Sequence, residues 1–151
     1  MGATQVSVQR MINRFNASGH KYPSDVYALR GAPTIDDFCN ICVREANAEG
    51  VRAEVLFSQA MHETGWLQFG GAVLPEQCNF GGIGATDSGG IPATFPTVEI
   101  GLRAQVQHLK AYACTEPLVR ICVDPRFNLV SRGCAPYVEW LGQGENPTGQ
   151  G

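Results

Sequence analysis

The chain has 151 residues, of which 44% are hydrophobic and 17% are charged, with a formal net charge of −3. This composition is typical of one folded globular domain and argues against a disordered chain. Lysine and arginine are scattered without a run, so we expect no nucleic-acid partner and no basic membrane-binding patch.

The apolar stretches of the chain are far too short to cross a bilayer, and the N-terminus lacks the pattern of a signal peptide. We therefore expect no membrane insertion. If the protein is exported, it would need a segment outside this sequence or another route.

The chain contains six cysteines, an even count. Cys39 and Cys42 form a C-x-x-C motif inside an expected helix, and no second such motif completes a zinc site. We expect no metal and no cofactor. Free buried thiols are the favoured interpretation. A set of disulfide bridges is the alternative, with Cys114 and Cys122 as the pair closest in sequence outside that helix.

The first part of the chain contains three segments with helical patterns. Residues 7–17 carry apolar side chains at helical spacing, which predicts an amphipathic helix. A second helix should begin after Thr34, which has an aspartate in the capping-box position, and end at residue 50. A third should run over residues 51–65, so these two helices are expected to form a hairpin. Residues 21–33 contain prolines and a glycine, which predicts an irregular arm. Four side chains would pack this arm: Tyr22, Val26, Tyr27 and Leu29.

Glu63 stands at the end of the third helix. On a helical wheel it falls on the side of Leu56 and Ala60, which predicts a carboxylate on the buried face. Desolvation would then raise its pKa and suit it to general acid catalysis. The alternative is a partly buried structural glutamate, satisfied by an arginine or by backbone donors.

Residues 69–94 contain seven glycines and two prolines. Such a segment predicts a loop or short hairpin lobe, which we expect to form a cleft wall opposite Glu63. Another long helix should run from Thr97 to about Cys114. His108 on this helix is expected to be a packed or surface residue. The remaining tail is expected to form a turn, one or two short helices and a frayed end.

Several catalytic motifs are excluded. His62 and Glu63 begin a pattern like the H-E-x-x-H zinc-protease motif, but the position of the second histidine is Trp66. The chain has no G-x-S-x-G motif and no P-loop.

Two motifs resemble those of a known family. Residues 59–66 have the pattern Q-A-x-x-E-T-G-W, and residues 79–84 have N-F-x-G-I-G. Together with the helix that follows, they resemble the bacterial endo-β-N-acetylglucosaminidase family (glycoside hydrolase family 73) of autolysins, flagellar muralytic enzymes and phage lysins. The resemblance covers about residues 34–113. It implies a mainly α, lysozyme-like helical domain with a small β-hairpin or loop lobe over a substrate groove.

A single catalytic domain over residues 1–151 follows from this resemblance. It would comprise an N-terminal helix and arm (1–33), a catalytic core (34–114) and a C-terminal tail of short helices (115–151). Glu63 would be the general acid. Asp87 is the first candidate for a second carboxylate, ahead of Glu76 and Glu99. The groove residues would be Trp66, Phe69, Asn79, Phe80, Gly82, Ile83 and Tyr112, although Trp66 is as well explained by packing at the helix end and packing is favoured for Phe80.

The expected function is cleavage of the β-1,4 bond between N-acetylglucosamine and N-acetylmuramic acid in bacterial peptidoglycan. The alternatives are a muramidase, a lytic transglycosylase or a catalytically silent wall-binding module. We expect a monomer that acts outside the cell, in the cell wall or after release at phage lysis. Because a glycine-flanked turn such as that expected around Asp87 cannot hold a close, fixed geometry by itself, we expect the substrate's own 2-acetamido group to act at the anomeric carbon. Asp87→Asn should then cost far less than Glu63→Gln, and the product should keep the β-configuration.

Overall fold

The computed structural model describes residues 1–85, 90–142 and 146–147. Five α-helices form in this part of the chain: α1 (Val8–Ala17), α2 (Ser24–Tyr27), α3 (Ile35–Glu49), α4 (Ala53–Glu63) and α5 (Val98–Ala113). Four short 3-10 helices accompany them: η1 (Ala28–Arg30), η2 (Pro75–Gln77), η3 (Phe127–Leu129) and η4 (Val138–Trp140). The mainly α fold class is thereby confirmed.

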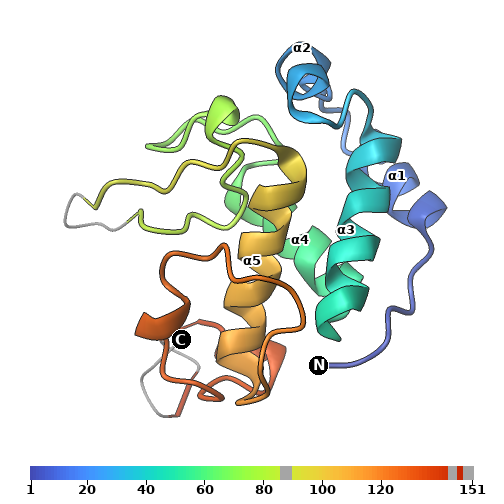
Figure 1. Cartoon of the computed structure of the whole chain (residues 1–151). Coiled ribbons are helices and arrows are strands. Elements are labelled where there is room, and N and C mark those ends of the chain that lie inside the picture. Colours follow the sequence, from blue (N-terminus) through green and yellow to red (C-terminus); the bar gives the residue numbers. More distant parts are fainter. Residues whose placement is uncertain (86–89, 143–145, 148–151) are drawn as a thin grey trace.

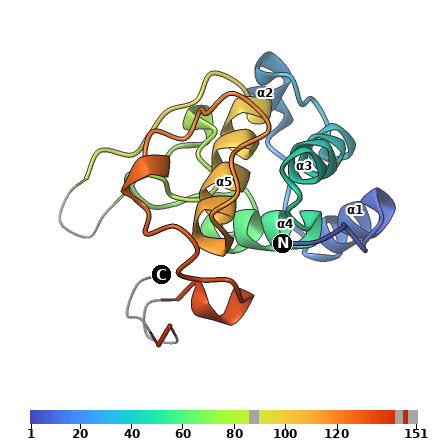
Figure 2. The ribbon, with the colours of Figure 1, turned by 60° about the horizontal axis from the view of Figure 1, so that its bottom comes forward.

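Helix α3 is the centre of the molecule, because it packs against α1, α4 and α5. In Figure 1, α3 and α5 stand upright and α4 lies between them. Figure 2 shows α3 from its end while α4 runs across the view, so the two helices cross instead of lying side by side. The expected α3–α4 contact is present, but its geometry differs from that of a simple antiparallel hairpin.

The helix boundaries follow from local capping chemistry. Thr34 accepts a hydrogen bond from the backbone N–H of Asp37, and the Asp37 carboxylate accepts one from the backbone N–H of Thr34. Ser7 and Thr97 cap α1 and α5 in the same way, each through its side-chain oxygen. These side chains satisfy N–H groups that have no partner inside the helix, so the starts of all three helices were predictable.

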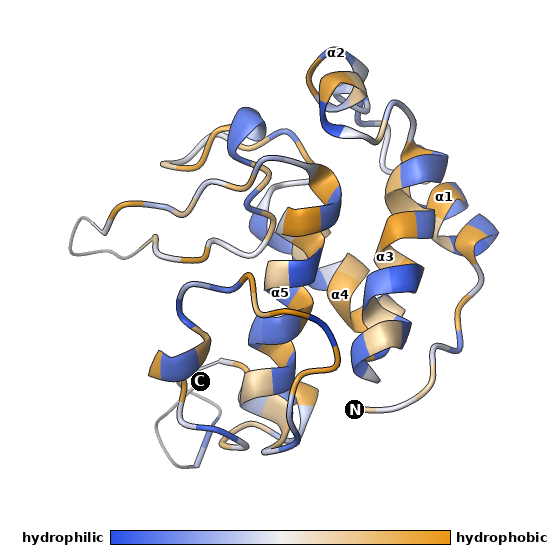
Figure 3. Ribbon diagram, in the orientation of Figure 1, coloured by the Kyte–Doolittle hydropathy of each residue, from blue (hydrophilic) through white to orange (hydrophobic). Residues whose placement is uncertain are grey.

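The core combines the apolar faces of the helices with a group of aromatic rings. Phe80, from the glycine-rich segment, packs edge-on against Phe38 and Tyr27, with ring centroids 5.2 and 5.8 Å apart. Figure 3 shows apolar and polar residues on different sides of α1, α3 and α5, as expected for helices that bury one face. Through Phe80, the segment that follows α4 is fixed to the helical core.

The expected β-hairpin lobe is not supported. Between α4 and α5, the described residues contain η2 but no strand. Backbone hydrogen bonds join Ala93 to Ile83 and Phe95 to Gln77, but they do not extend into a ladder. The side chain of Asn79 forms hydrogen bonds with backbone groups of Ile83 and Ala93, which would pair with each other's strands in a hairpin.

The arm over residues 21–33 is more regular than expected, because it contains α2 and η1. Tyr22 and Tyr27 are buried as expected, whereas Leu29 is 85% exposed and does not pack the arm. Within the described residues, no helix combines the length and apolarity that a membrane span requires.

The C-terminal segment wraps back over the end of α5. Gly133 and Ala135 donate backbone hydrogen bonds to the carbonyl oxygens of Ala111 and Tyr112. The two 3-10 helices η3 and η4 lie in this segment, in agreement with the short helices predicted for the tail.

Candidate active site

The end of α4 carries an unusual backbone. Glu63 is the last helical residue, and Gly65, Trp66 and Leu67 then follow with φ angles of 55°, 61° and 64°. Gly65 therefore takes a left-handed conformation. A left-handed conformation costs a non-glycine residue about 1–2 kcal/mol, so Trp66 and Leu67 must be held in it by their surroundings.

Hydrogen bonds and burial supply this restraint. The Thr64 hydroxyl donates to the carbonyl oxygen of Ala60 and accepts from the N–H of Leu67 at 2.8 Å. The N–H of Trp66 donates to Met61 and that of Phe69 donates to Thr64, each at 2.7 Å. Leu67 is only 1% exposed. Strained backbone of this kind is often found at functional sites, and here it begins directly after Glu63.

Glu63 is exposed, so the prediction of a carboxylate on the buried face is wrong. The helical wheel places Glu63 near Leu56 and Ala60, which are both fully buried. At the last position of α4, however, the side chain extends past the core contacts of the preceding turns. Within the described part of the chain, its carboxylate has neither an ion pair nor a hydrogen bond.

Glu63 lines a cavity of about 260 Å³ between the end of α4 and the glycine-rich segment. Gly82 lies across this cavity, and a Cβ atom built on it would stand 3.9 Å from Oε2 of Glu63. The φ of Gly82 is 62°, which favours glycine. The absence of a side chain at Gly82 leaves the carboxylate open to a ligand. The full lining is Glu63, Thr64, Gly65, Phe69, Gly71, Ala72, Val73, Gly82 and Ala85.

The turn that carries Gly82 is built by Asn79. The buried Asn79 amide donates to the carbonyl oxygens of Ile83 and Ala93 at 2.8 and 3.1 Å, and it accepts from the N–H of Ile83 at 2.9 Å. Both polar atoms of the side chain are therefore engaged with the backbone. Phe80 and Ile83 are 0% and 3% exposed. These three residues shape the cavity wall from within, in agreement with the packing role favoured for Phe80.

The two other aromatic candidates lie apart from Glu63. Trp66 turns toward α1, where its ring lies 6.3 Å from that of Phe15 and a parallel His20 ring lies at the same distance. Tyr112 lies on α5 beside His108, with ring centroids 5.1 Å apart. Phe69 is thus the one predicted groove aromatic that lines the Glu63 cavity among the described residues.

The candidates for a second carboxylate are not assembled with Glu63 in the described residues. Asp87 lies outside them. Glu99 is paired with Arg103 at 2.6 Å and with Arg44 at 2.8 Å, which makes it part of a structural network. Glu76 is exposed on η2 and does not line the cavity.

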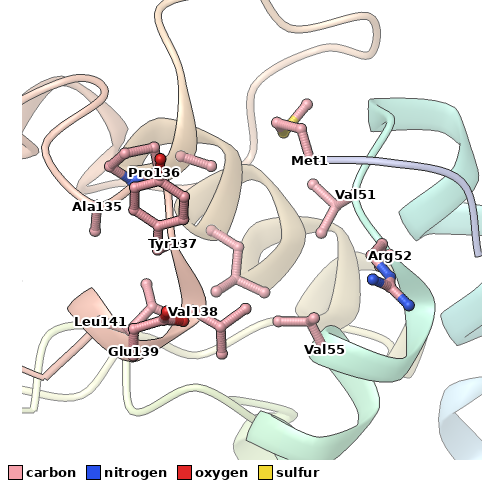
Figure 4. Close-up of a pocket in the computed structure, with 12 residues that line it drawn as sticks. Met1, Val51, Arg52, Val55, Ala135, Pro136, Tyr137, Val138, Glu139 and Leu141 are labelled. Atoms are coloured by element: carbon pink, nitrogen blue, oxygen red, sulfur yellow. The ribbon is translucent and has the colours of Figure 1, made fainter.

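Two further observations describe what lies outside this site. No group of three or more metal-ligating side chains was found among the described residues. A second cavity of about 250 Å³, shown in Figure 4, is bounded by Met1, the start of α4, the end of α5 and residues 135–141. Its walls are mainly apolar, and none of the predicted site residues lines it.

Sequence reasoning missed several features of the site. Residues 71–73 line the cavity and belong to the segment expected to form its wall, but none of them was among the predicted groove residues. Sequence reasoning also missed the pairing of His108 Nδ1 with the buried Asp124 carboxylate at 2.7 Å. His108 is half-buried, which agrees with its expected packed or surface position.

Comparison with known proteins adds two findings. The sequence model of the glucosaminidase family, described as mannosyl-glycoprotein endo-beta-N-acetylglucosaminidase, matches residues 39–142. An uncharacterised protein of Borreliella burgdorferi is 35% identical over 143 residues, which cover 90% of this chain and 70% of the relative. No solved structure matches the chain significantly.

Proposed function

Because the chain belongs to the glucosaminidase family of glycoside hydrolases, we propose that it cleaves the β-1,4 bond between N-acetylglucosamine and N-acetylmuramic acid in peptidoglycan, with Glu63 as general acid. The observation that carries this proposal is the free Glu63 carboxylate, which faces Gly82 across an open cavity.

In this reaction Glu63 gives its proton to the glycosidic oxygen that leaves. A general acid must come within about 2.6–3.2 Å of that oxygen. Gly82 favours such an approach, because this residue adds no side chain to the wall that faces the carboxylate. A sugar bound in the cavity would also displace water from Glu63. Substrate binding would thereby desolvate the carboxylate, which is exposed in the free protein.

The second chemical role is assigned to the substrate. A protein nucleophile in a retaining enzyme stands about 5–5.5 Å from the acid, and a base in an inverting enzyme about 6.5–9.5 Å away. Neither Glu76 nor Glu99 lines the cavity. The 2-acetamido oxygen of N-acetylglucosamine can attack its own anomeric carbon, which requires only one protein acid and keeps the β-configuration.

Asn79 and Tyr112 carry polar groups that could orient the acetamide, but neither is free beside Glu63. The Asn79 amide is engaged with the backbone, and Tyr112 lies beside His108 outside the cavity lining. Backbone groups of the cavity wall are therefore the better candidates for holding the acetamide.

The test is the rate of wall lysis by Glu63→Gln, compared with the exposed tail variant Glu116→Gln. General acid catalysis contributes about 10²–10⁴-fold, so Glu63→Gln should lose activity on that scale while it keeps its melting temperature. Glu116→Gln should match the parent. Near-normal lysis by a folded Glu63→Gln protein would exclude the assignment.

Product analysis identifies the bond. Digests reduced with borohydride should contain N-acetylglucosaminitol and no new reduced muramic acid. New reduced muramic acid would indicate a muramidase, and anhydro-muropeptides would indicate a lytic transglycosylase.

NMR of the first anomer formed tests whether the substrate's acetamido group takes part in the reaction. We expect a β-product from the parent protein and an active Asp87→Asn variant. An α-product with an inactive variant would mean inversion with Asp87 as base.

With this activity the protein would act at the bacterial cell wall, either after export or after release at phage lysis. We propose that it acts as a monomer.

A further inference from the structure

A third cavity, of about 250 Å³, lies on the α1 side of the end of α4. Its lining is Arg14, Phe57, Ser58, Met61, His62 and Trp66, and we name it the Arg14–Trp66 pocket. Phe57 and Met61 are buried and form an apolar base. Arg14, Ser58 and His62 are exposed and bring hydrogen-bonding groups to the rim. None of the six lining residues is acidic.

Arg14, the cationic residue of this pocket, is held in place by an aromatic ring and not by a carboxylate. The guanidinium carbon of Arg14 lies 5.2 Å from the ring centroid of Trp66, which is a cation–π contact. In the part of the chain that the structure describes, Arg14 has no carboxylate partner. Its N–H donors are therefore free for a ligand. The described cationic side chains Arg44, Arg52, Arg103 and Lys110 are instead paired with glutamates.

The strained turn aims Trp66 into this position. Its left-handed φ of 61° follows directly from Gly65, and the His20 ring packs parallel to the indole at 6.3 Å with an interplanar angle of 9°. Trp66 is thus fixed between α1 and α4, and its ring packs against the guanidinium of Arg14. A flexible arginine supported in this way loses less entropy when it binds a planar anion.

Consecutive residues at the end of α4 line the pocket and the Glu63 cavity. His62 lines the first and Glu63, the next residue, lines the second. A glycan strand bound at Glu63 would therefore pass beside the Arg14–Trp66 pocket. In peptidoglycan every second sugar carries a short peptide with free carboxylates, and a guanidinium pairs with a carboxylate through two parallel hydrogen bonds.

From these contacts we infer that the Arg14–Trp66 pocket binds a carboxylate of the peptide attached to the peptidoglycan strand. This inference rests on the proposed function for its choice of ligand. Arg14 holds the carboxylate, Ser58 and His62 supply further hydrogen bonds, and the apolar base accommodates the aliphatic part of the peptide. The pocket makes the enzyme prefer strands that carry peptides over bare glycan.

The experiment measures binding through the fluorescence of Trp66. The chain has two tryptophans, so Trp140→Phe leaves Trp66 as the only one. The probe is an N-acetylmuramoyl peptide with free carboxylates, compared with the same molecule amidated at every carboxylate. The free acid should change the Trp66 emission saturably, and the amide should bind at least about tenfold more weakly because it lacks the charged hydrogen bonds.

Two arginine variants provide the matched comparison. Arg14→Gln should weaken binding of the free acid about tenfold. Arg10→Gln removes a charge from an exposed residue of the same helix that does not line the pocket, and it should bind like the parent. Equal binding of acid and amide, or equal loss in both variants, would overturn the inference. Inorganic phosphate that displaces the peptide with equal affinity would also overturn it, because the pocket would then be a general anion site.

Lysis of whole peptidoglycan by the same proteins separates the two proposals. If Glu63-dependent lysis occurs without binding of the muramoyl peptide, only the pocket assignment fails. If the peptide binds through Arg14 and no glycan is cut, the proposed function fails and the binding site stands.

Discussion

At the scale of single residues, Glu63 differs from Glu45 and Glu49, the two buried glutamates of α3, by its lack of partners. Glu45 accepts hydrogen bonds from Arg44 and Arg103, and Glu49 accepts them from Lys110 and two backbone N–H groups. Both are buried. Glu63 is exposed, and no contact among the described residues neutralises it. Freedom from partners combined with a place in the cavity lining, and not burial, is therefore what makes Glu63 a candidate for chemistry.

The cavity opposite Glu63 should depend on Gly82. In Gly82→Ala the added methyl group would stand close to the carboxylate and force a left-handed alanine, at a cost of about 1–2 kcal/mol. We expect a large loss of lysis rate with a modest loss of thermal stability. Gly31→Ala, at a left-handed glycine with open space around it, should show a similar stability loss and normal lysis. Equal lysis by the two variants would contradict this account of the cavity.

At the scale of elements, α5 supports the site through a glycine. Gly101 lies in the first part of α5, where a Cβ atom would overlap the backbone carbonyl oxygen of Cys78. Cys78 itself has a φ of 49° and directly precedes Asn79. The missing side chain lets the glycine-rich segment rest on the helix, so this close approach sets the position of the turn that carries Gly82.

Replacing Gly101 by alanine should therefore destabilise the protein. In an ordinary helix this substitution is stabilising by about 0.5–1 kcal/mol, but here the methyl group meets backbone, and overpacking typically costs about 1–3 kcal/mol. Urea denaturation measures the sign directly. A variant more stable than the parent would show that the turn does not rest on Gly101.

A buried ion pair joins α3, α5 and the tail. The Glu49 carboxylate accepts hydrogen bonds from Lys110 Nζ at 3.0 Å and from the N–H groups of Val119 and Arg120 at 3.0 and 2.9 Å. Burial opposes the ionisation of Glu49, but these hydrogen bonds outweigh it and lower its pKa below the usual 4.5. The charged carboxylate thus stabilises the folded chain.

This pair predicts a pH dependence with a defined sign. A carboxyl group whose pKa is lowered by folding stabilises the protein above its unfolded pKa, and the effect is lost as pH falls through the folded pKa. Glu49→Gln should therefore melt well below the parent at pH 7, and the gap should shrink below about pH 4.5. Melting curves from pH 3 to 7 measure it, with the exposed Glu76→Gln as control. A gap that stays constant with pH would contradict the role of the charge.

At the scale of the whole molecule, the cysteines divide into two sets. All six are free, as the favoured interpretation expected, but only Cys39, Cys42 and Cys78 are buried; Cys122 is exposed, and Cys114 and Cys134 are partly exposed. Burial raises the pKa of Cys39 to about 12 and that of Cys78 to about 11. Burial also raises the pKa of Cys42 well above its usual value.

Thiol titration should reveal these two sets. At pH 8 the native protein should react rapidly at Cys114, Cys122 and Cys134 and slowly at the three buried thiols, because the thiolate is the reactive form. The unfolded, unreduced protein should show all six. Reductant should change the lysis rate little, since no cysteine lines the Glu63 cavity. Fewer than six thiols in the unfolded chain would indicate bridges.

Much of the fold was predictable because its signals are local. Thr34 with Asp37, Ser7, Thr97 and Gly50 mark helix ends through contacts within a few residues. The candidate site was only partly predictable. Glu63 and Gly82 face each other across the cavity, as expected for the cleft wall. The sequence could not show that the Asn79 amide binds backbone groups, or that Trp66 turns toward α1.

The sequence by itself determined the helices α1, α3, α4 and α5, the buried stripes of α1, α3 and α5, and the family. These depend on periodicity, on capping side chains and on two short motifs. Only the tertiary structure decided that Glu63 is exposed, that the lobe lacks a hairpin in its described part and that Arg14 meets Trp66. The physical reason is that helical periodicity assigns a face only within a regular helix. Beyond Glu63 the chain enters a left-handed turn, whose direction depends on contacts with distant residues such as Phe15 and His20.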